Sequence, residues 1–435
     1  MENILIKNID IITADKDNEF ISNGQILISG GIIEFAGKGE IPENLLPDKI
    51  IDGKNKLAMP GLINAHTHSG MTLLRNYAND LALEDWLYKK IFPAEARIEE
   101  EDIYWGTLLA IIEMIKSGTT CFADIYLHMD QTAKAVCESG IRANLSRSLL
   151  KFSSDDRKPI DDSELCIKYH KDWHGRENGR LIVSLEVHSV YLFDLQSLKN
   201  AAELAKKLGI GIQIHILETV TERTESIKKY GMDSAEICAE CGIFDVPTVA
   251  AHCVHMSEND YYILKSKNVS VAHNPTSNLK LGSGIANIPY MMKCGINVAL
   301  GTDGTASNNN LNMFEEMHLA ALIHKGYNMN PQLINAKQTI NMATVNGAKA
   351  VGFGDSVGVI KNGMKADIII LDMNKPHLTP VNDPFSAVVY SAQASDVDTV
   401  IVDGRILMEG RRLINIDEEL VKYKVREISK RLLNG

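Results

Sequence analysis

Between residues 59 and 358, strand-like runs alternate with amphipathic helical runs, and this alternation limits the fold more than any other feature of the sequence. It is the pattern of parallel β/α units, because parallel neighbours need a crossover connection. Eight runs are expected to be strands: Leu62–His68, Thr119–Asp124, Arg142–Leu149, Leu181–His188, Gly211–Leu217, Thr248–His252, Val269–Asn274 and Ile296–Thr302. Helical stretches separate most of them: Glu99–Lys116, Ser197–Leu208, Glu258–Lys267 and Leu311–His324. We therefore predict an α/β fold built on a (β/α)8 TIM barrel.

The two ends of the chain carry short strand patterns instead. Residues 1–58 have strand-like runs around Gly30-Gly31, and the segment after residue 358 has them around Asn362-Gly363 and Asp403-Gly404. We predict that residues 1–58 and 359–435 form one small discontinuous β-sandwich domain, and that residues 59–358 form the catalytic barrel.

Composition excludes several classes of function. The net charge of -11 argues against nucleic acid as a partner, because a phosphate backbone needs a basic surface. No run approaches the ~18 apolar residues of a membrane span, and the acidic start of the chain is unlike a signal peptide, so we expect a cytoplasmic protein. Seven scattered cysteines fit a reducing compartment, and Cys238 and Cys241 are expected to be ordinary helix cysteines despite their C-x-x-C spacing.

Polar side chains follow the ends of the expected strands, where barrel enzymes place their chemistry. His66 and His68 alternate with Thr67, so both imidazoles project from one face of a strand and can hold one divalent ion. Such a pair is also compatible with two buried histidines bonded to backbone. The other residues at strand ends favour the metal: Asp124, His188, His215, His252, Asn274 and Asp303.

In this order on alternating β/α units, these residues resemble the amidohydrolase superfamily, and the resemblance covers nearly the whole chain. It implies that His66, His68, His215 and Asp303 hold a divalent metal, which lowers the pKa of a bound water to about 7. Two-metal members carry a bridging lysine at the end of strand four, where this chain has His188. We therefore expect one ion, Zn²⁺, although Fe(II), Mn(II) and Ni(II) suit the same ligands.

Glu218 follows His215 by three residues and is the candidate general acid, because hydrolysis of an aromatic C–NH2 requires protonation of the neighbouring ring nitrogen. His252 is expected to polarise the attacking water. Asp303 is expected to take its proton and pass it to the leaving ammonia. His255 is expected to be structural or to support the metal ligands.

Longer sequence motifs, chiefly residues 274–282 and 301–309, resemble those of one family within this superfamily, the 5-methylthioadenosine/S-adenosylhomocysteine deaminases. The resemblance implies a set of substrate-binding residues. Glu95 would accept hydrogen bonds from the ribose hydroxyls, and Trp86 would pack its flat apolar ring against the thioether arm of the substrate. His188 would bond the sugar or purine, Glu218 the purine ring nitrogen, and Arg147 with Arg157 the homocysteine carboxylate.

We predict hydrolytic deamination of 5-methylthioadenosine and S-adenosylhomocysteine to the inosine analogue and ammonia by a metal-activated hydroxide, with adenosine and 5'-deoxyadenosine as further candidates. Another one-metal amidohydrolase, such as a guanine deaminase or a triazine-type chlorohydrolase or aminohydrolase, stays open, as does a non-catalytic barrel that serves in assembly. The expected partner is a small adenosine-type molecule, and pairing into a homo-oligomer is compatible with such a barrel.

Overall fold

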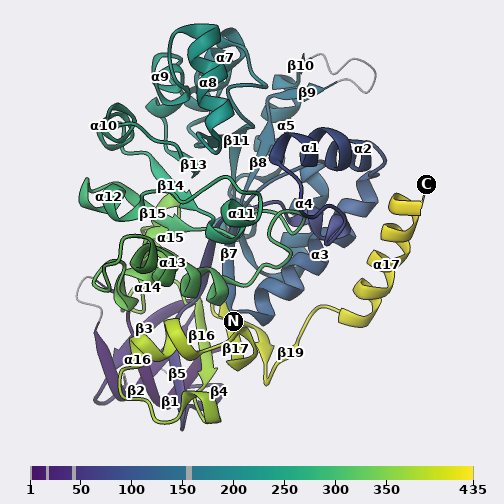
Figure 1. Cartoon of the computed structure of the whole chain (residues 1–435). Coiled ribbons are helices and arrows are strands. Elements are labelled where there is room, and N and C mark those ends of the chain that lie inside the picture. Colours follow the sequence, from purple (N-terminus) through teal and green to yellow (C-terminus); the bar gives the residue numbers. More distant parts are fainter. Residues whose placement is uncertain (1, 16–18, 42–45, 153–158, 435) are drawn as a thin grey trace.

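The computed structural model describes the chain apart from residues 1, 16–18, 42–45, 153–158 and 435, and its centre is an eight-stranded parallel sheet that curls into a barrel (Figure 1). Each strand pairs with the next one along the chain. In order they are β6 (Leu62–Thr67), β7 (Thr119–Ile125), β8 (Arg142–Ser148), β11 (Leu181–Val187), β12 (Ile212–Ile216), β13 (Thr248–His252), β14 (Ser270–His273) and β15 (Asn297–Leu300). The predicted TIM barrel is confirmed.

The barrel closes without a strand ladder between its first and last strands, as far as the described residues show. Specific bonds bridge β15 and β6 instead. The Asp303 amide donates to the His66 carbonyl at 2.9 Å. Asn64 donates its side-chain amide to Thr302 Oγ1 at 2.7 Å and accepts the Thr302 amide at 3.0 Å. We refer to this junction as the seam.

Alternation along each strand explains why the site lies inside the barrel. In β12, Ile212, Ile214 and Ile216 join the main apolar core, so Gln213 and His215 face the opposite way. The larger surrounding helices are α3 (Glu100–Lys116), α4 (Met129–Ser139), α5 (Ser163–Trp173), α7 (Leu195–Leu208), α8 (Val220–Tyr230), α9 (Ser234–Glu240), α10 (Glu258–Ser266), α13 (Met313–Tyr327) and α14 (Ala336–Ala343). Shorter helices include α1 (Leu83–Trp86), α2 (Phe92–Glu95), α11 (Pro275–Lys280), α12 (Ile288–Lys293) and α15 (Val345–Ala350).

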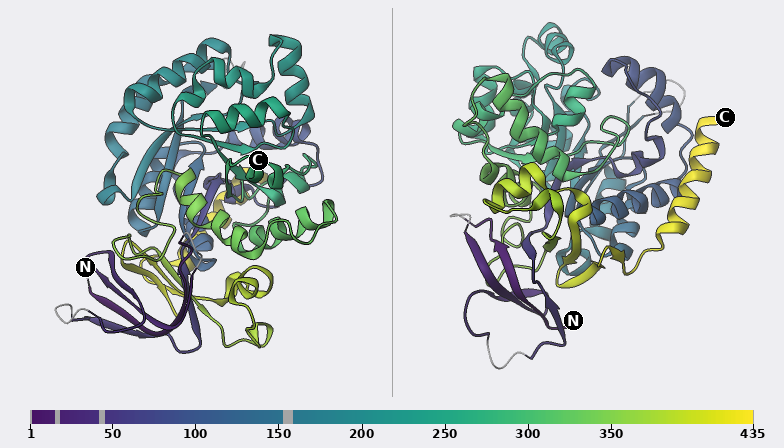
Figure 2. Two further views of the ribbon diagram at one scale, coloured as in Figure 1. Left: turned by 90° about the vertical axis from the view of Figure 1, so that its left-hand side faces the viewer. Right: turned by 60° about the horizontal axis from the view of Figure 1, so that its bottom comes forward.

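Strands from both ends of the chain form a second sheet of nine strands, which Figure 2 shows beside the barrel. The N-terminal strands are β1 (Ile4–Ile12), β2 (Phe20–Ser29), β3 (Ile32–Gly37), β4 (Lys49–Asp52) and β5 (Lys56–Pro60). The C-terminal strands are β16 (Ile368–Asp372), β17 (Val397–Val402), β18 (Arg405–Glu409) and β19 (Arg412–Leu413), followed by helix α17 (Glu418–Asn434). Antiparallel pairing of β16 with β5 joins the two ends, as expected, and the boundaries at residues 59 and 358 stay predictions.

A buried ion pair ties this sheet to the barrel. Arg142, at the start of β8, donates from Nε to Asp367 Oδ2 at 2.7 Å and from Nη2 to Asp367 Oδ1 at 2.8 Å. Asp403 lies 3.7 Å from Arg142 Nη2 and 3.0 Å from the ammonium of Lys365. Because Arg142 and both carboxylates are nearly inaccessible, the charges are satisfied by one another.

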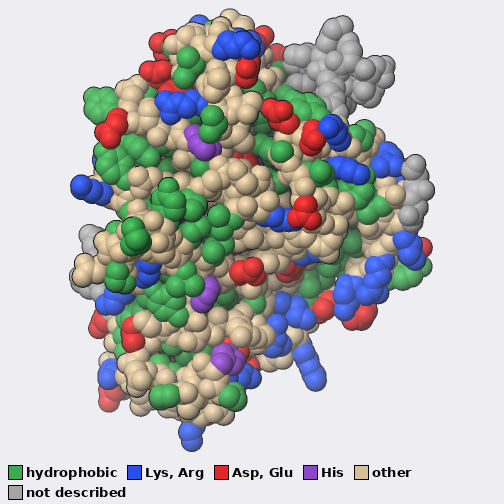
Figure 3. Space-filling view, viewed as in Figure 1, with side chains coloured by type: hydrophobic (Ala, Val, Ile, Leu, Met, Phe, Trp, Pro, Cys, Tyr) green, Lys and Arg blue, Asp and Glu red, His purple; other side chains and the backbone are tan. Residues whose placement is uncertain are grey.

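Cys238, in α9, and Cys241, directly after it, have buried side chains and are not joined by a disulfide. No helix among the described residues is long and apolar enough to cross a bilayer. On the face shown in Figure 3, acidic side chains are interspersed with lysine and arginine.

Candidate active site

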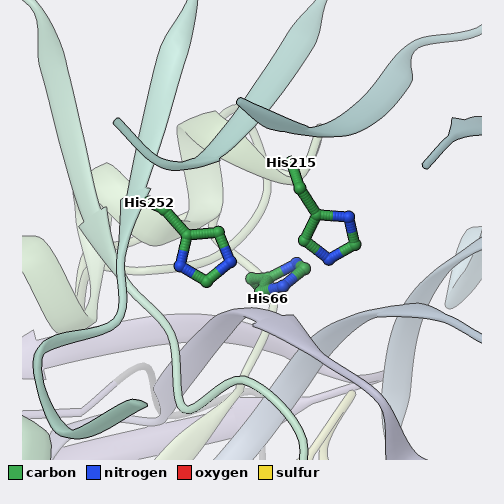
Figure 4. A group of neighbouring side chains, drawn as sticks. All are labelled: His66, His215 and His252. Atoms are coloured by element: carbon green, nitrogen blue, oxygen red, sulfur yellow. The ribbon is translucent and has the colours of Figure 1, made fainter. Parts of the chain in front are cut away.

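The four predicted metal ligands converge at the carboxyl ends of the strands. His68 Nε2 lies 3.3 Å from His215 Nε2 and 3.1 Å from Asp303 Oδ1. His66 Nε2 lies 3.6 Å from the same Asp303 oxygen. The imidazole of His252 is also close, since ligand atoms of His66, His215 and His252 lie within 4.8 Å of one another (Figure 4). Residues far apart in the sequence therefore share one small site.

Hydrogen bonds on the far side of two rings orient them for a cation. His215 Nδ1 donates to the His188 carbonyl at 2.8 Å, and His68 Nδ1 donates to the Ile125 carbonyl at 2.5 Å. The Nε2 atoms of both rings are thus turned toward the shared site. His66 Nε2 is buried without a hydrogen-bond partner among the described residues. An orphaned imidazole nitrogen beside two oriented rings fits a divalent cation.

The pKa values of two of the three predicted histidine ligands favour metal binding, and that of the third does not. Burial lowers the pKa of His66 to about 4 and the pKa of His215 well below its ordinary value, so both rings are neutral, as metal ligands must be. Burial also disfavours a charge on His68, but the Asp303 carboxylate raises the pKa of His68 to about 9. A proton on His68 therefore competes with a cation for this position.

Asp303 is held by hydroxyls from two different loops. Its Oδ2 accepts hydrogen bonds from Ser277 Oγ at 2.6 Å and Ser307 Oγ at 3.0 Å, and Oδ1 accepts the Gly304 amide at 2.7 Å. Although burial opposes its charge, the nearby imidazoles of His66 and His68 hold the pKa of Asp303 well below its usual range. Asp303 is therefore an ionised carboxylate with Oδ1 facing the imidazoles.

Glu218 lies at the edge of this group, as a general acid requires. Its side chain is buried, and Oε2 lies 3.8 Å from His252 Nε2. Oε1 accepts a hydrogen bond from Ser283 Oγ at 3.1 Å. Burial raises the pKa of Glu218, which favours the protonated form. On the other side, His252 Nδ1 donates to Asn278 Oδ1 at 2.8 Å, which leaves Nε2 turned toward Glu218.

Three residues at the site adopt positive φ angles that side-chain-bearing residues rarely take. Leu217, His252 and Asp303 have φ of 52°, 74° and 62°. Each follows or ends a barrel strand, so the chain turns sharply at the rim. Such conformations persist only where the surroundings over-determine them, and they concentrate at functional sites.

Several predicted substrate residues lie next to this group. The ring centroid of His188 is 4.7 Å from that of His215. Trp86 is buried in an apolar cluster with Met71 and Ala306, and Ala306 lies three residues after Asp303. Glu95 is half-buried at the end of α2. His255, expected to be structural or supporting, bonds the Ser283 carbonyl at 2.8 Å.

Arg147 is placed differently from the other predicted residues. Its guanidinium lies 3.3 Å from Asp130 in α4 and 3.1 Å from Asp162 at the start of α5. The preceding residue, Ser146, accepts a hydrogen bond from Gln213, which shares its strand face with His215. Since successive side chains alternate, Arg147 points toward the helices, and no contact among the described residues joins it to the imidazoles. Arg157 lies outside the described residues.

Sequence reasoning missed several residues around the site. Tyr126 follows β7, its ring centroid is 6.1 Å from that of His68, and burial together with the Glu95 carboxylate raises its pKa well above the usual value. Glu186 is buried two residues before His188, and burial raises its pKa to about 8. Position at a strand end was the available signal for Tyr126. The two serines that hold Asp303 had no such signal.

The imidazoles and the carboxylate grouped at the rim of the barrel fit a metal-dependent hydrolase. The amidohydrolase family matches residues 57–407. The chain belongs to this family.

Two relatives and one solved structure match this chain over nearly its full length. A 5-methylthioadenosine/S-adenosylhomocysteine deaminase from Acetivibrio thermocellus is 62% identical over 99% of this chain and 100% of its own. A 5'-deoxyadenosine deaminase from Methanosarcina acetivorans is 46% identical over 100% of this chain and 99% of its own. The crystal structure of an adenosine deaminase from Xanthomonas campestris with bound zinc has a TM-score of 0.94 at 29% identity, covering 100% and 99% of the two chains.

Proposed function

We propose that this protein removes the amino group of the adenine ring in 5-methylthioadenosine and S-adenosylhomocysteine by hydrolysis, releasing ammonia. The observation that carries the proposal is the buried Glu218 carboxyl beside His252, at the edge of the four predicted metal ligands. Relatives that bear this name match the chain from end to end, which supports it. The relative named for 5'-deoxyadenosine keeps that nucleoside among the candidates.

The proposed metal ligands are His66, His68, His215 and Asp303, and Zn²⁺ is the expected ion. When bound, the cation supplies Lewis acidity that makes water a nucleophile at neutral pH. His215 and His68 turn their Nε2 atoms toward the shared site through Nδ1 bonds to the His188 and Ile125 carbonyls. The absence of a lysine at the end of β11 favours one ion over two.

The proton movements fall to residues of this chain. Protonated Glu218 donates to the ring nitrogen beside the carbon that carries the amino group, which makes that carbon electrophilic. His252 Nε2 accepts a hydrogen bond from the attacking water, because Nδ1 is already committed to Asn278. Asp303 takes the proton of the water and delivers it to the departing amine. As ammonia departs, the proton of the added hydroxyl passes to Glu218, which restores its acid form. Water and the aminopurine thus become the inosine-type product and ammonia.

The sugar and its 5' arm are assigned to the surrounding residues. Glu95 accepts hydrogen bonds from the ribose hydroxyls, and His188 forms a hydrogen bond with the sugar or the purine edge. Trp86 packs against the thioether arm. Arg147 would meet a homocysteine carboxylate only by exchanging Asp130 or Asp162 for it. The ratio of kcat/KM for 5-methylthioadenosine and S-adenosylhomocysteine therefore reports whether that exchange occurs.

The test is turnover by the purified metal-loaded protein. 5-Methylthioadenosine, S-adenosylhomocysteine, 5'-deoxyadenosine, adenosine and guanine are each supplied, and the adenine-to-hypoxanthine absorbance shift and released ammonia are measured. Glu95→Ala is expected to lower kcat/KM for the nucleosides, and Glu84→Ala, an exposed acid on α1, is the matched control. Release of ammonia from guanine alone, or from none of these compounds, would overturn the proposal.

A further inference from the structure

Glu222, in the first turn of α8, grips the backbone that leads from His215 to Glu218. Its Oε1 accepts the Leu217 amide at 2.8 Å, and its Oε2 accepts the Glu218 amide at 3.1 Å. The side chain is buried, with 7% of its surface exposed. One carboxylate thus binds two consecutive amides, one of which belongs to the proposed general acid.

The backbone at this point needs such support. Leu217 has a φ of 52°, a conformation that costs a residue with a side chain on the order of 1–3 kcal/mol. The Leu217 carbonyl is held from the opposite side by the amides of Val254 and His255, each at 2.9 Å. Glu222 therefore completes a clamp on both faces of the Leu217 peptide.

Glu222 is itself fixed by the start of its helix. Its amide donates to the side chain of Thr219, the N-cap of α8, at 3.1 Å. Among the described residues no lysine or arginine forms an ion pair with Glu222, so the carboxylate is not part of a charge pair. Its two oxygens instead accept from backbone N–H groups next to the site, and burial raises the pKa of Glu222 to about 7.

We propose that Glu222 is a positioning residue, which holds the Glu218 carboxyl where it can deliver its proton to the purine ring. This inference rests on the proposed function for the role of Glu218. A carboxylate is suited to the task because both of its oxygens accept. Glu222→Gln keeps the shape but turns an NH2 group toward one of the amides, so one bond is lost and two donors face each other.

The first test compares Glu222→Gln with Glu225→Gln in metal-loaded enzyme. Glu225 is a matched control because it lies on the same helix and contacts Lys228 at an exposed position. Glu222→Gln is expected to lower kcat for 5-methylthioadenosine by on the order of 10- to 10²-fold, as misplacement by about 1 Å can, with KM and zinc content unchanged. Glu225→Gln is expected to match the wild type.

A binding measurement separates positioning from a loss of folded protein. A nucleoside analogue with a tetrahedral hydroxyl-bearing carbon in place of the amino-bearing one should bind Glu222→Gln more weakly by the same factor as kcat/KM, because it is matched to the transition state. The inosine-type product should bind as it does to the wild type. Equal weakening of both, or of neither, would overturn the proposal.

Hydrogen exchange of the backbone tests the clamp independently of any substrate. Amides of residues 217 and 218 should exchange at least about tenfold faster in Glu222→Gln and at the wild-type rate in Glu225→Gln. Unchanged exchange would refute the role of Glu222 even if the protein acted on a different substrate. If Glu222→Gln does not fold, Glu222→Asp, whose shorter side chain withdraws both oxygens, is expected to give the same results.

Discussion

Replacement of Glu218 by glutamine probes the centre of the proposed chemistry. The amide has the size of the carboxyl and still accepts the Ser283 hydroxyl, which lies at 3.1 Å, so the pocket should be preserved. It cannot supply an acidic proton. Since only 7% of Glu218 is exposed, bulk water has no ready path to replace it. We expect kcat to fall by about 10²–10⁴-fold, the usual contribution of a general acid, or about 2.7–5.4 kcal/mol in activation free energy.

The general-acid role of Glu218 also predicts the direction in which kcat changes with pH. Burial raises the pKa of Glu218 above its ordinary value, so the proton-bearing form survives to higher pH than in an exposed glutamate. The wild-type kcat should therefore fall as pH rises through the pKa of Glu218 in the enzyme–substrate complex. This fall should be missing from Glu218→Gln.

The assay follows the absorbance change of the purine at several pH values, with zinc content measured on the same samples. Glu225→Gln is a control for loss of an acidic residue nearby on α8. A fully metal-loaded Glu218→Gln enzyme within about threefold of the wild-type rate would show that another group protonates the ring, since a general acid is worth far more.

Three further outcomes are expected. Chelation should abolish turnover and added Zn²⁺ should restore it, so full activity after verified metal removal would contradict the mechanism. Ser277→Ala removes a 2.6 Å hydrogen bond to Asp303 and should weaken zinc binding by about 10- to 100-fold in competition with a chelator, whereas unchanged affinity would deny that role. Arg142→Ala leaves buried Asp367 and Asp403 without their guanidinium and should cost about 3–5 kcal/mol in urea unfolding, and a loss below about 1 kcal/mol would refute the buried-charge argument.

The strands and the polar residues at their ends were accessible from the sequence because both depend on local pattern and chain order. Parallel strands bring their carboxyl ends to one rim, so polar residues at those ends converge whatever their separation along the chain. The strand-end positions of His66, His68, His215 and Asp303 were visible in this way, whereas their selection as a ligand set came from the family resemblance and stays a prediction. The structure places their side-chain atoms 3.1–3.6 Å apart.

Other features depend on packing between distant segments, which no single stretch encodes. The proximity of Tyr126 to Glu95 requires that the end of α2 lies near the residue after β7. The orientation of Arg147 could have been inferred by parity, because Ser146 shares the inward face with the polar side chains of β12. In the sequence, nothing distinguishes Glu222 from other acidic residues of a helix. Its contact with the Leu217 amide depends on the turn after β12, which only the structure shows.

The seam between β15 and β6 gives the proposed ion a mechanical task. His66 and His68 belong to one side of this junction and Asp303 to the other. A cation bound by all three would therefore crosslink the first and last strands of the barrel, β6 and β15. Loss of the ion should therefore loosen the molecule first along this line, and amides flanking it should be the earliest to exchange with deuterium.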